Sequence, residues 1–193
     1  MILIATGMAA EARLMAAPGV VVVAGGGDHA RLELELDAAA GKARLIVSSG
    51  LAGALSPALA VGDVVVDGAW EWPGAHYGAV IGSDRPIATV DDKARAGRDG
   101  ALAVDMESHV ARRVAARHGL PFLAVRVISD SALHALPPAA LAGMQPDGGI
   151  ALGAVLASLA RRPGQLPALI RTALDAGTAM RVLRRVGPAV SAA

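Results

Sequence analysis

The sequence has no cysteine, only four aromatic residues and almost no net charge. Its 193 residues include two Trp, one Tyr and one Phe, and the formal charge is +1. The lack of cysteine excludes a disulfide framework, a thiolate nucleophile and a zinc–cysteine site, and it suits a reducing cytosol. A charge so close to zero gives no broad electrostatic attraction for nucleic acid, so no nucleic-acid partner is expected.

Long hydrophobic runs are missing as well. The longest apolar run near the carboxyl terminus, residues 150–160, has eleven residues, whereas a membrane-spanning helix needs about 20. The apolar start of the chain lacks a charged leader and reaches Glu11 quickly, so it indicates a strand and not a signal peptide. Hydrophobic residues make up 54% of the chain, which excludes intrinsic disorder. We therefore expect one cytoplasmic domain over residues 1–186, followed by a flexible tail over residues 187–193.

Hydrophobic patterning predicts strands mixed with helices. Strands are expected at residues 1–6, 20–24, 32–37, 43–49, 63–66, 78–82, 101–104 and 121–128. A helix is predicted where Met106, Val110 and Val114 recur every four residues before Gly119, and further helices at residues 149–159 and 165–185. With no internal repeat, this mixture predicts one α/β sheet covered by helices.

Two features, a glycine-rich segment and five histidines, suggest nucleotide or metal binding, but neither has the full pattern that such a site needs. Residues 25–30 (GGGDHA) match the dinucleotide-binding pattern, but that site needs a helix next, and residues 32–37 alternate like a strand. We interpret the glycines as a hairpin turn. The five histidines lack tight ligand spacing, so no metal site is expected.

Carboxylates at predicted strand ends are the stronger candidates. Glu11 follows the first strand, Asp105 and Glu107 flank Met106, and Asp130 ends the strand at 121–128. Open α/β sheets place ligands at strand ends. Acids also favour helix caps and first turns, so each residue alone has a structural explanation. The pattern cannot show whether these side chains converge.

Four segments, in order along the chain, resemble the nucleoside phosphorylase/nucleosidase superfamily. Residues 50–57 (GLAGALSP) with 61–65 (VGDVV) resemble its glycine loop and following strand, and 104–108 (VDMES) its ribose-binding segment. Residues 126–130 (RVISD) resemble another landmark, and 4–11 (IATGMAAE) look like the opening of methylthioadenosine/S-adenosylhomocysteine nucleosidases. Residues 84–89, 145–150 and 162–170 resemble the hopanoid-associated branch, which removes adenine from adenosylhopane.

The resemblance implies a three-layer α/β/α domain with a central mixed, twisted sheet, which cleaves the N-glycosidic bond of a 5′-substituted adenosine. It makes Asp130 the general acid at adenine N7, with Ser129 helping to hold it. Glu107 would accept hydrogen bonds from the ribose hydroxyls, Met106 would pack against the sugar, and Glu11 would orient or activate the attacking water. The remaining substrate-binding positions that it implies are Met8, Ala52, Gly53, Pro86 and Ile87.

The nucleophile stays open between water and inorganic phosphate. Family phosphorylases hold phosphate with an arginine and a serine at the glycine loop, and Leu51 offers no hydroxyl at the position we align with that serine. Glu11 favours water, whereas Arg13 and Arg85 could contact an anion. The resemblance implies no cofactor and no metal, with phosphate as a co-substrate in one alternative.

Two segments bear on partners. Trp70, Trp72 and Tyr77 cluster within eight residues, at an apolar 5′ pocket, a subunit interface or a loop packed on the core. Residues 161–185 carry six arginines and one acid beside an apolar face. A packed terminal helix is favoured there, and contact with the inner face of an anionic membrane is the alternative.

The preferred substrate is lipid-linked adenosine, adenosylhopane, and relatives suggest a homodimer. A methylthioadenosine/S-adenosylhomocysteine nucleosidase or a purine nucleoside phosphorylase, each acting on a small molecule, is the alternative enzyme. A nucleoside-binding scaffold without catalysis is the alternative outside enzymes.

Overall fold

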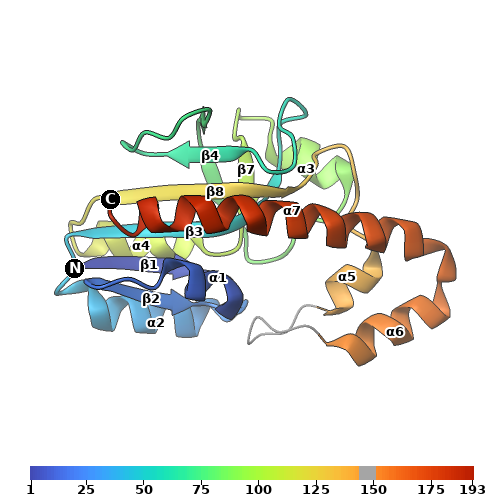
Figure 1. The fold of residues 1–193 in the computed structure, drawn as a ribbon, viewed down its shortest axis with the longest axis horizontal. Coiled ribbons are helices and arrows are strands. Elements are labelled where there is room, and N and C mark those ends of the chain that lie inside the picture. Colours follow the sequence, from blue (N-terminus) through green and yellow to red (C-terminus); the bar gives the residue numbers. More distant parts are fainter. Residues whose placement is uncertain (144–150) are drawn as a thin grey trace.

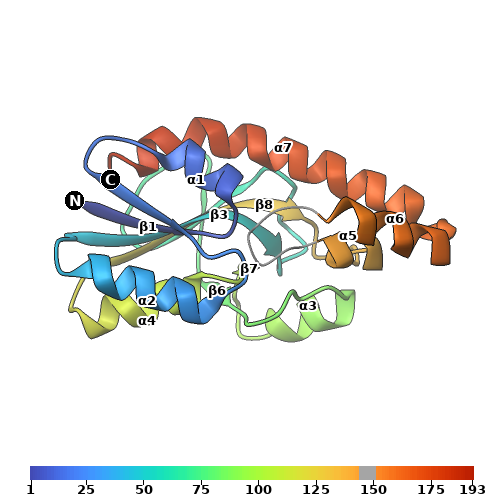
Figure 2. The same ribbon diagram turned by 90° about the horizontal axis from the view of Figure 1, so that it is seen from below.

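The computed structural model describes residues 1–143 and 151–193, which form one mixed sheet with helices on both faces (Figures 1 and 2). The strands are β1 (Ile2–Thr6), β2 (Val20–Ala24), β3 (Leu45–Ala54), β4 (Val64–Asp67), β5 (His76–Tyr77), β6 (Val80–Gly82), β7 (Ala103–Asp105) and β8 (Phe122–Asp130). The helices are α1 (Ala9–Met15), α2 (His29–Ala40), α3 (Val90–Ala96), α4 (Ser108–Arg117), α5 (Pro138–Gly143), α6 (Leu152–Arg161) and α7 (Leu166–Val190), with a 3₁₀ turn at Pro163–Gln165.

The sheet brings the carboxyl ends of its parallel strands to one edge. The strand order is β2-β1-β3-β8-β4-β5, with β7 pairing with the end of β3 and β6 pairing with β7. Strands β2, β1, β3 and β8 run parallel, whereas β4 is antiparallel to β8. In the β3–β8 register Gly50 lies beside Arg126 and Gly53 beside Asp130. The ends of β1, β3, β7 and β8 therefore supply the residues of the candidate site.

Two helical layers enclose the sheet. Figure 2 shows α1 and α7 on one face and α2 and α4 on the other. Leu183 and Val186 of α7 are fully buried on the first face, and Val110 and Val114 of α4 on the second. Their spacing of three or four residues gives each helix one apolar stripe toward the sheet. The expected three-layer α/β/α fold is confirmed.

The prediction of a strand at residues 32–37 is wrong, because this segment belongs to α2. Leu32 and Leu36 have no exposed surface, whereas Leu34 between them is 70% exposed. A Leu–acid alternation has period two, yet its first and third leucines are also four residues apart and share one helix face. Asp28 caps the helix by accepting a hydrogen bond from the Arg31 amide (2.9 Å).

The interpretation of residues 25–30 as a hairpin turn is also wrong, because a hairpin needs a second strand and the segment that follows is a helix. This loop does lead from a strand into a helix, but the amides of its first two glycines already donate hydrogen bonds within the chain. The amides of Gly25 and Gly26 donate to the carbonyl oxygens of Thr6 (2.7 Å) and Gly7 (2.8 Å). The Arg31 guanidinium donates a hydrogen bond to the Gly25 carbonyl (3.0 Å). These contacts hold the loop against the end of β1 and leave two of the glycine amides unavailable to a pyrophosphate.

The carboxyl terminus is helical further than the sequence suggests. Residues 187–190, predicted as part of a flexible tail, are the last turn of α7, and Gly187 and Val190 are buried. Ser191 donates a hydrogen bond to the Met15 carbonyl (2.8 Å), which holds this end against α1. Residues 145–150, used for the hopanoid resemblance, lie outside the described residues, as does the start of the helix expected at 149–159. Within the described parts, no helix has both the length and the hydrophobicity to cross a membrane.

Two members of the aromatic cluster, Trp70 and Trp72, pack on the core at the far end of the sheet from Asp130. Trp70 and Trp72 stack with ring centroids 5.7 Å apart and are partly buried against the core beneath α7. The loop that carries them follows β4, whose last residue Asp67 pairs with Ala124 near the start of β8. The two tryptophans therefore pack on the core, whereas Tyr77 is 56% exposed, and the loop does not border a pocket beside Asp130 in the same chain.

Candidate active site

The segment after β7 gives two neighbouring carboxylates different surroundings. Asp105 Oδ1 accepts hydrogen bonds from the amides of Glu107 (3.0 Å) and Ser108 (2.7 Å), so Asp105 caps the start of α4. Glu107 has no such role and lies against Gly7, where an added Cβ would approach its Oε1 to 2.9 Å. Asp105 is therefore structural, and the Glu107 carboxylate is directed to the edge of the sheet.

Glu11 joins the end of β1 to β3. Its Oε2 accepts hydrogen bonds from the Thr6 hydroxyl (2.6 Å) and from the amides of Gly7 (3.0 Å) and Met8 (2.8 Å). Its Oε1 accepts one from the Leu51 amide (2.8 Å), forty residues away. The side chain is 2% exposed. Because a carboxylate oxygen has two lone pairs, Oε1 retains capacity for one more donor.

Arg126 of β8 links these acids. It is fully buried, with Nε 2.7 Å from Asp105 Oδ2 and Nη2 3.3 Å from Glu107 Oε2. The guanidinium also donates to Ser48 Oγ (2.5 Å) and to the Leu51 carbonyl (3.3 Å). A Cβ at Gly50 would come within 3.0 Å of both Glu11 and Arg126, so glycine is needed for this close approach. One arginine therefore holds the glycine segment of β3 and the acids together.

The electrostatics of this group leave Glu107 poised between its two charge states. Burial, together with the negative charges of Asp105 and Glu11, raises the pKa of Glu107 to about 7, although Arg126 opposes the rise. The free site can therefore bind or release a proton at Glu107 near neutral pH. Such a shift is typical of functional sites.

Asp130 ends β8 and is held by two side chains. The Ser129 hydroxyl lies 3.2 Å from both Asp130 Oδ1 and the Ala52 carbonyl. The ammonium of Lys93 in α3 forms an ion pair with Asp130 Oδ2. Lys93 has no exposed surface, and it also donates to the carbonyls of Ser131 (2.7 Å) and His134 (3.1 Å). A fully buried ammonium is thus compensated by one carboxylate and two carbonyls.

Some of the other predicted substrate-binding residues lie close to these acids, and others lie on a separate segment. Gly53 lies against Asp130, since a Cβ there would approach Oδ2 to 3.1 Å. Met8 and Met106 are half-buried beside Glu11 and Glu107. Ile87 packs on a small apolar cluster, and Pro86 beside it is exposed. The strand ends therefore bring together three acids and five of the other predicted residues: Glu11, Glu107, Asp130, Met8, Ala52, Gly53, Met106 and Ser129. The last two predicted residues, Pro86 and Ile87, lie on the segment after β6.

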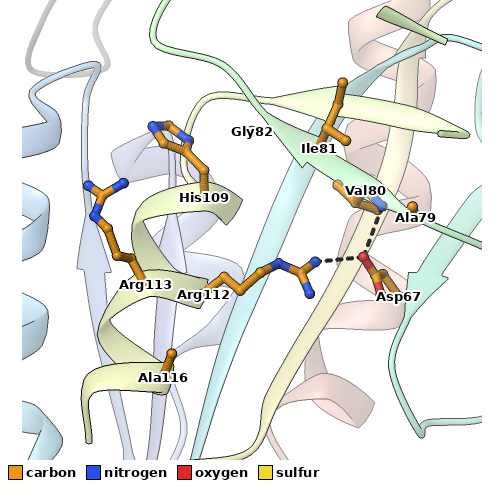
Figure 3. A pocket seen from close by; sticks show the side chains of 9 residues that line it. All are labelled: Asp67, Ala79, Val80, Ile81, Gly82, His109, Arg112, Arg113 and Ala116. Carbon is orange, nitrogen blue, oxygen red and sulfur yellow. Dashed lines mark hydrogen bonds and ion pairs between the residues drawn. The ribbon is translucent and has the colours of Figure 1, made fainter. Parts of the chain in front are cut away.

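A groove of about 720 Å³ lies elsewhere, between β6 and α4 (Figure 3). Asp67 in its wall accepts hydrogen bonds from the Val80 amide (3.0 Å) and from Arg112 (2.6 Å). Glu11, Glu107 and Asp130 do not line it. Its volume alone therefore does not make it the reaction site, and the acids at the strand ends stay the candidates.

Just under half of the chain matches a known family model. A family model described as the phosphorylase superfamily matches residues 73–161, a stretch that includes Glu107 and Asp130. A search of curated protein sequences finds no match.

Solved structures share the fold of this chain. S-adenosylhomocysteine nucleosidase from Streptococcus pyogenes, in complex with 5-methylthiotubericidin, is 18% identical, with a TM-score of 0.56 over 90% of this chain and 95% of that one. The methylthioadenosine/S-adenosylhomocysteine nucleosidase of S. pneumoniae, with a transition-state inhibitor, is 19% identical, with a TM-score of 0.55 over 94% and 99%. A mutant of the Helicobacter pylori nucleosidase with methylthioadenosine in its active site is 15% identical, with a TM-score of 0.57 over 95% and 96%.

Two buried cations were not assigned roles from sequence. Lys93 lies in a segment, Asp91-Asp92-Lys93, that is typical of an exposed helix start. Arg126 falls on a strand predicted to be buried, and a charged residue in such a strand is a signal that a partner acid exists elsewhere. The sequence does not say which acid that is, because Asp105 and Glu107 are about twenty residues away.

Proposed function

We propose that this protein cleaves the N-glycosidic bond of a 5′-substituted adenosine and releases adenine. The observation that carries the proposal is the placement of three carboxylates, Glu107 beside Gly7, and Glu11 and Asp130 along β3. Glu11 adjoins Gly50 and Asp130 adjoins Gly53. Three residues of strand span about 10 Å, an interval that suits a sugar at one end and a purine at the other.

Glu107 is the group proposed for the sugar. Its ionised carboxylate accepts hydrogen bonds from the two ribose hydroxyls, and Met106 packs against the ring. As the glycosidic bond breaks, positive charge develops on the ribosyl group. The negative charge of Glu107 stabilises that charge in a site from which water is largely excluded.

Asp130 is the group proposed for the leaving base. The bond electrons move to adenine, and N7 takes up a proton from Asp130. The ion pair in the structure supplies a source for this proton, because the Lys93 ammonium can pass one to Asp130 before Asp130 passes it to N7. Ser129, within reach of Oδ1, orients the carboxyl group for that transfer.

Water is the nucleophile that the contacts favour. Arg126, the arginine beside the glycine segment, is engaged by Asp105, Glu107, Ser48 and the Leu51 carbonyl, so it is not free to bind phosphate. Glu11 has one carboxylate oxygen with room for a further donor. We assign it the role of orienting water for attack on the ribosyl carbon, with the water proton passing to Glu11.

We propose adenosylhopane, an adenosine attached to a triterpenoid in hopanoid biosynthesis, as the substrate. The support is a projecting arm formed by α6 and the first half of α7, which extends beyond the sheet in Figures 1 and 2. Its large apolar side chains are exposed to between 47% and 69%: Leu152, Leu156, Leu166, Ile170 and Leu174.

The arm fits an anionic membrane surface that holds such a lipid. Leu166, Ile170 and Leu174 recur every four residues and so share one helix face. Exposed Arg181 and Arg184 continue along the helix at compatible spacing, and Arg161 and Arg171 add positive charge with one acid, Asp175, nearby in sequence. Apolar side chains beside arginines are typical of helices that lie on anionic lipid. We therefore propose peripheral membrane contact through this arm.

Methylthioadenosine or S-adenosylhomocysteine is the second candidate substrate. It is favoured by the solved structures, whose names give these small molecules and whose chains align over most of their length. Both candidates share the same bond cleavage and differ only in the group at the 5′ carbon.

The proposed reaction is tested by replacing Asp130 with Asn. Adenine release from a 5′-alkylated adenosine should fall by about 10²–10⁴-fold, because the acid is lost, whereas binding of the nucleoside by calorimetry should stay within tenfold. Asp175→Asn on α7 is the matched control and should keep full activity. A wild-type protein that binds the nucleoside but releases no adenine would show a binding scaffold and overturn the proposal.

A further inference from the structure

Two histidines and an aspartate, far apart in sequence, meet outside the candidate active site. His29 begins α2, Asp84 follows β6 and His109 lies in the first turn of α4. Asp84 Oδ1 is 2.9 Å from His109 Nε2 and 3.5 Å from His29 Nδ1. One ligand atom from each residue lies within 4.8 Å of the others. In the described part of the chain, this is the group with the geometry to hold a metal ion.

Each imidazole has one nitrogen that faces Asp84 and one buried nitrogen without a hydrogen-bond partner. His29 Nε2 and His109 Nδ1 are buried without a hydrogen-bond partner. A neutral imidazole has one protonated nitrogen and one lone pair. If the proton of each ring lies on its partnerless nitrogen, two lone pairs and a carboxylate face one another, an arrangement that repels without a positive charge between them.

We propose that His29, Asp84 and His109 bind a divalent transition-metal ion, with Zn²⁺ as the best fit. Zinc takes imidazole and carboxylate ligands at about 2.0–2.2 Å, which places neighbouring tetrahedral ligand atoms about 3.3 Å apart. The observed separations from Asp84, 2.9 and 3.5 Å, bracket that value. Three protein ligands leave the fourth position for water or a small anion.

The surroundings hold His109 in place and limit the affinity. A Cβ at Gly82 would come within 2.2 Å of His109 Nδ1, so the ring rests directly on the glycine backbone of β6 (Figure 3). Arg113, on the same helix, would repel a cation, but its charge is offset by Glu33 at 2.6 Å. The amino terminus of α2 also disfavours positive charge at His29. We therefore expect an ion that is bound reversibly.

The ion would add a link between α2, α4 and the segment after β6, of which α2 and α4 already share one hydrophobic cluster. It would fix the start of α2 and the start of α4 to the segment after β6. That segment continues through Pro86 and Ile87, and the first turn of α4 follows Glu107. The site is thus a tether beside the candidate active site and takes no part in the bond cleavage proposed above.

Titration with Co²⁺ and Zn²⁺ tests the proposal without any activity assay. Wild-type protein, stripped with a chelator, should bind one Co²⁺ with visible d–d absorption, and Zn²⁺ should displace it. His109→Ala and Asp84→Asn should each weaken Zn²⁺ binding by more than about tenfold. Asp84 is 79% exposed as a side chain, so its replacement leaves the core intact, which circular dichroism would check.

His118→Ala is the matched control, because His118 also pairs with an aspartate, Asp37, at 2.9 Å. It should bind Zn²⁺ like the wild type. Zinc should raise the unfolding midpoint of the wild type and of His118→Ala, and leave that of His109→Ala unchanged. Equal Zn²⁺ affinity in wild type, His109→Ala and Asp84→Asn, or a wild type that binds no ion, would overturn the proposal.

Discussion

The candidate active site buries more charged side chains than are needed to hold its helix and strands in place. Arg126 and Asp105 would suffice to cap α4 and anchor β8, yet Glu107 and Glu11 share the same desolvated space. Uncompensated buried charge costs stability, so such groups are retained where chemistry needs them. The sequence showed each acid at a strand end but could not show that Gly7 and Gly50 bring two of them together.

Glu107 gives a prediction for pH dependence. Its pKa of about 7 lies above the ordinary value for a glutamate, so the protein without ligand carries a neutral Glu107 below that pH and a carboxylate above it. Ribose hydroxyls need the carboxylate as acceptor. We therefore expect kcat/KM to rise with pH through an apparent pKa near 7.

Initial rates between pH 5 and 9 measure this profile. Glu107→Gln should retain little activity, and what remains should lose the limb near pH 7. An unchanged limb in that variant would assign the titration to another group.

Lys93 gives a second prediction. We expect Lys93→Met to lower kcat by about one to two orders of magnitude and to change KM little, because Lys93 contacts Asp130 and not the substrate. The variant should also be less stable by about 3 kcal/mol, since it leaves a partly buried carboxylate without its ion pair.

Steady-state kinetics and urea unfolding measure the two effects of Lys93→Met. Lys42→Met, at an exposed position, should alter neither. A Lys93→Met enzyme with wild-type kcat would remove Lys93 from the proton path.

Helices and strands were predictable from sequence where the apolar residues of a segment fit only one repeat, that of a helix or that of a strand. Buried strands such as β8 are continuous apolar runs, and α4 shows apolar residues every four positions, so both were located within a few residues. Helix α2 was missed because residues 32–37 fit period two and period four equally well. The short helices α1, α3 and α5 were also missed, since seven residues or fewer carry too little pattern.

The arm of α6 and α7 gives a prediction for lipid binding. Wild-type protein should float with vesicles that contain phosphatidylglycerol and much less with neutral phosphatidylcholine vesicles. Ile170→Ser together with Leu174→Ser should abolish flotation, because both side chains are exposed and provide the apolar contact. Arg171→Gln together with Arg181→Gln should weaken it in a salt-dependent way.

Leu34→Ser is the control for the arm, as Leu34 is an equally exposed leucine on α2. It should float like the wild type. A wild type that ignores anionic vesicles, and forms a dimer that Ile170→Ser with Leu174→Ser dissociates, would make the arm an interface between subunits instead.

At the scale of the whole molecule, the sheet topology assembles the site. Parallel β1, β3 and β8 end at one edge, and antiparallel β7 delivers Glu107 to the same place from a segment about a hundred residues after Glu11. Short motifs and their resemblance to a superfamily could suggest the members of this group. The long-range register, which depends on the packing of all three layers, could not be predicted from the motifs.

One measurement tests the central claim most directly. Purified protein is incubated with adenosylhopane or with methylthioadenosine, each with and without inorganic phosphate, and mass spectrometry follows adenine and the sugar product. We predict adenine and a free ribosyl lipid from adenosylhopane without phosphate. A strict need for phosphate with a ribosyl-1-phosphate product would contradict the role of Glu11, and no adenine from any 5′-substituted adenosine would contradict the account as a whole.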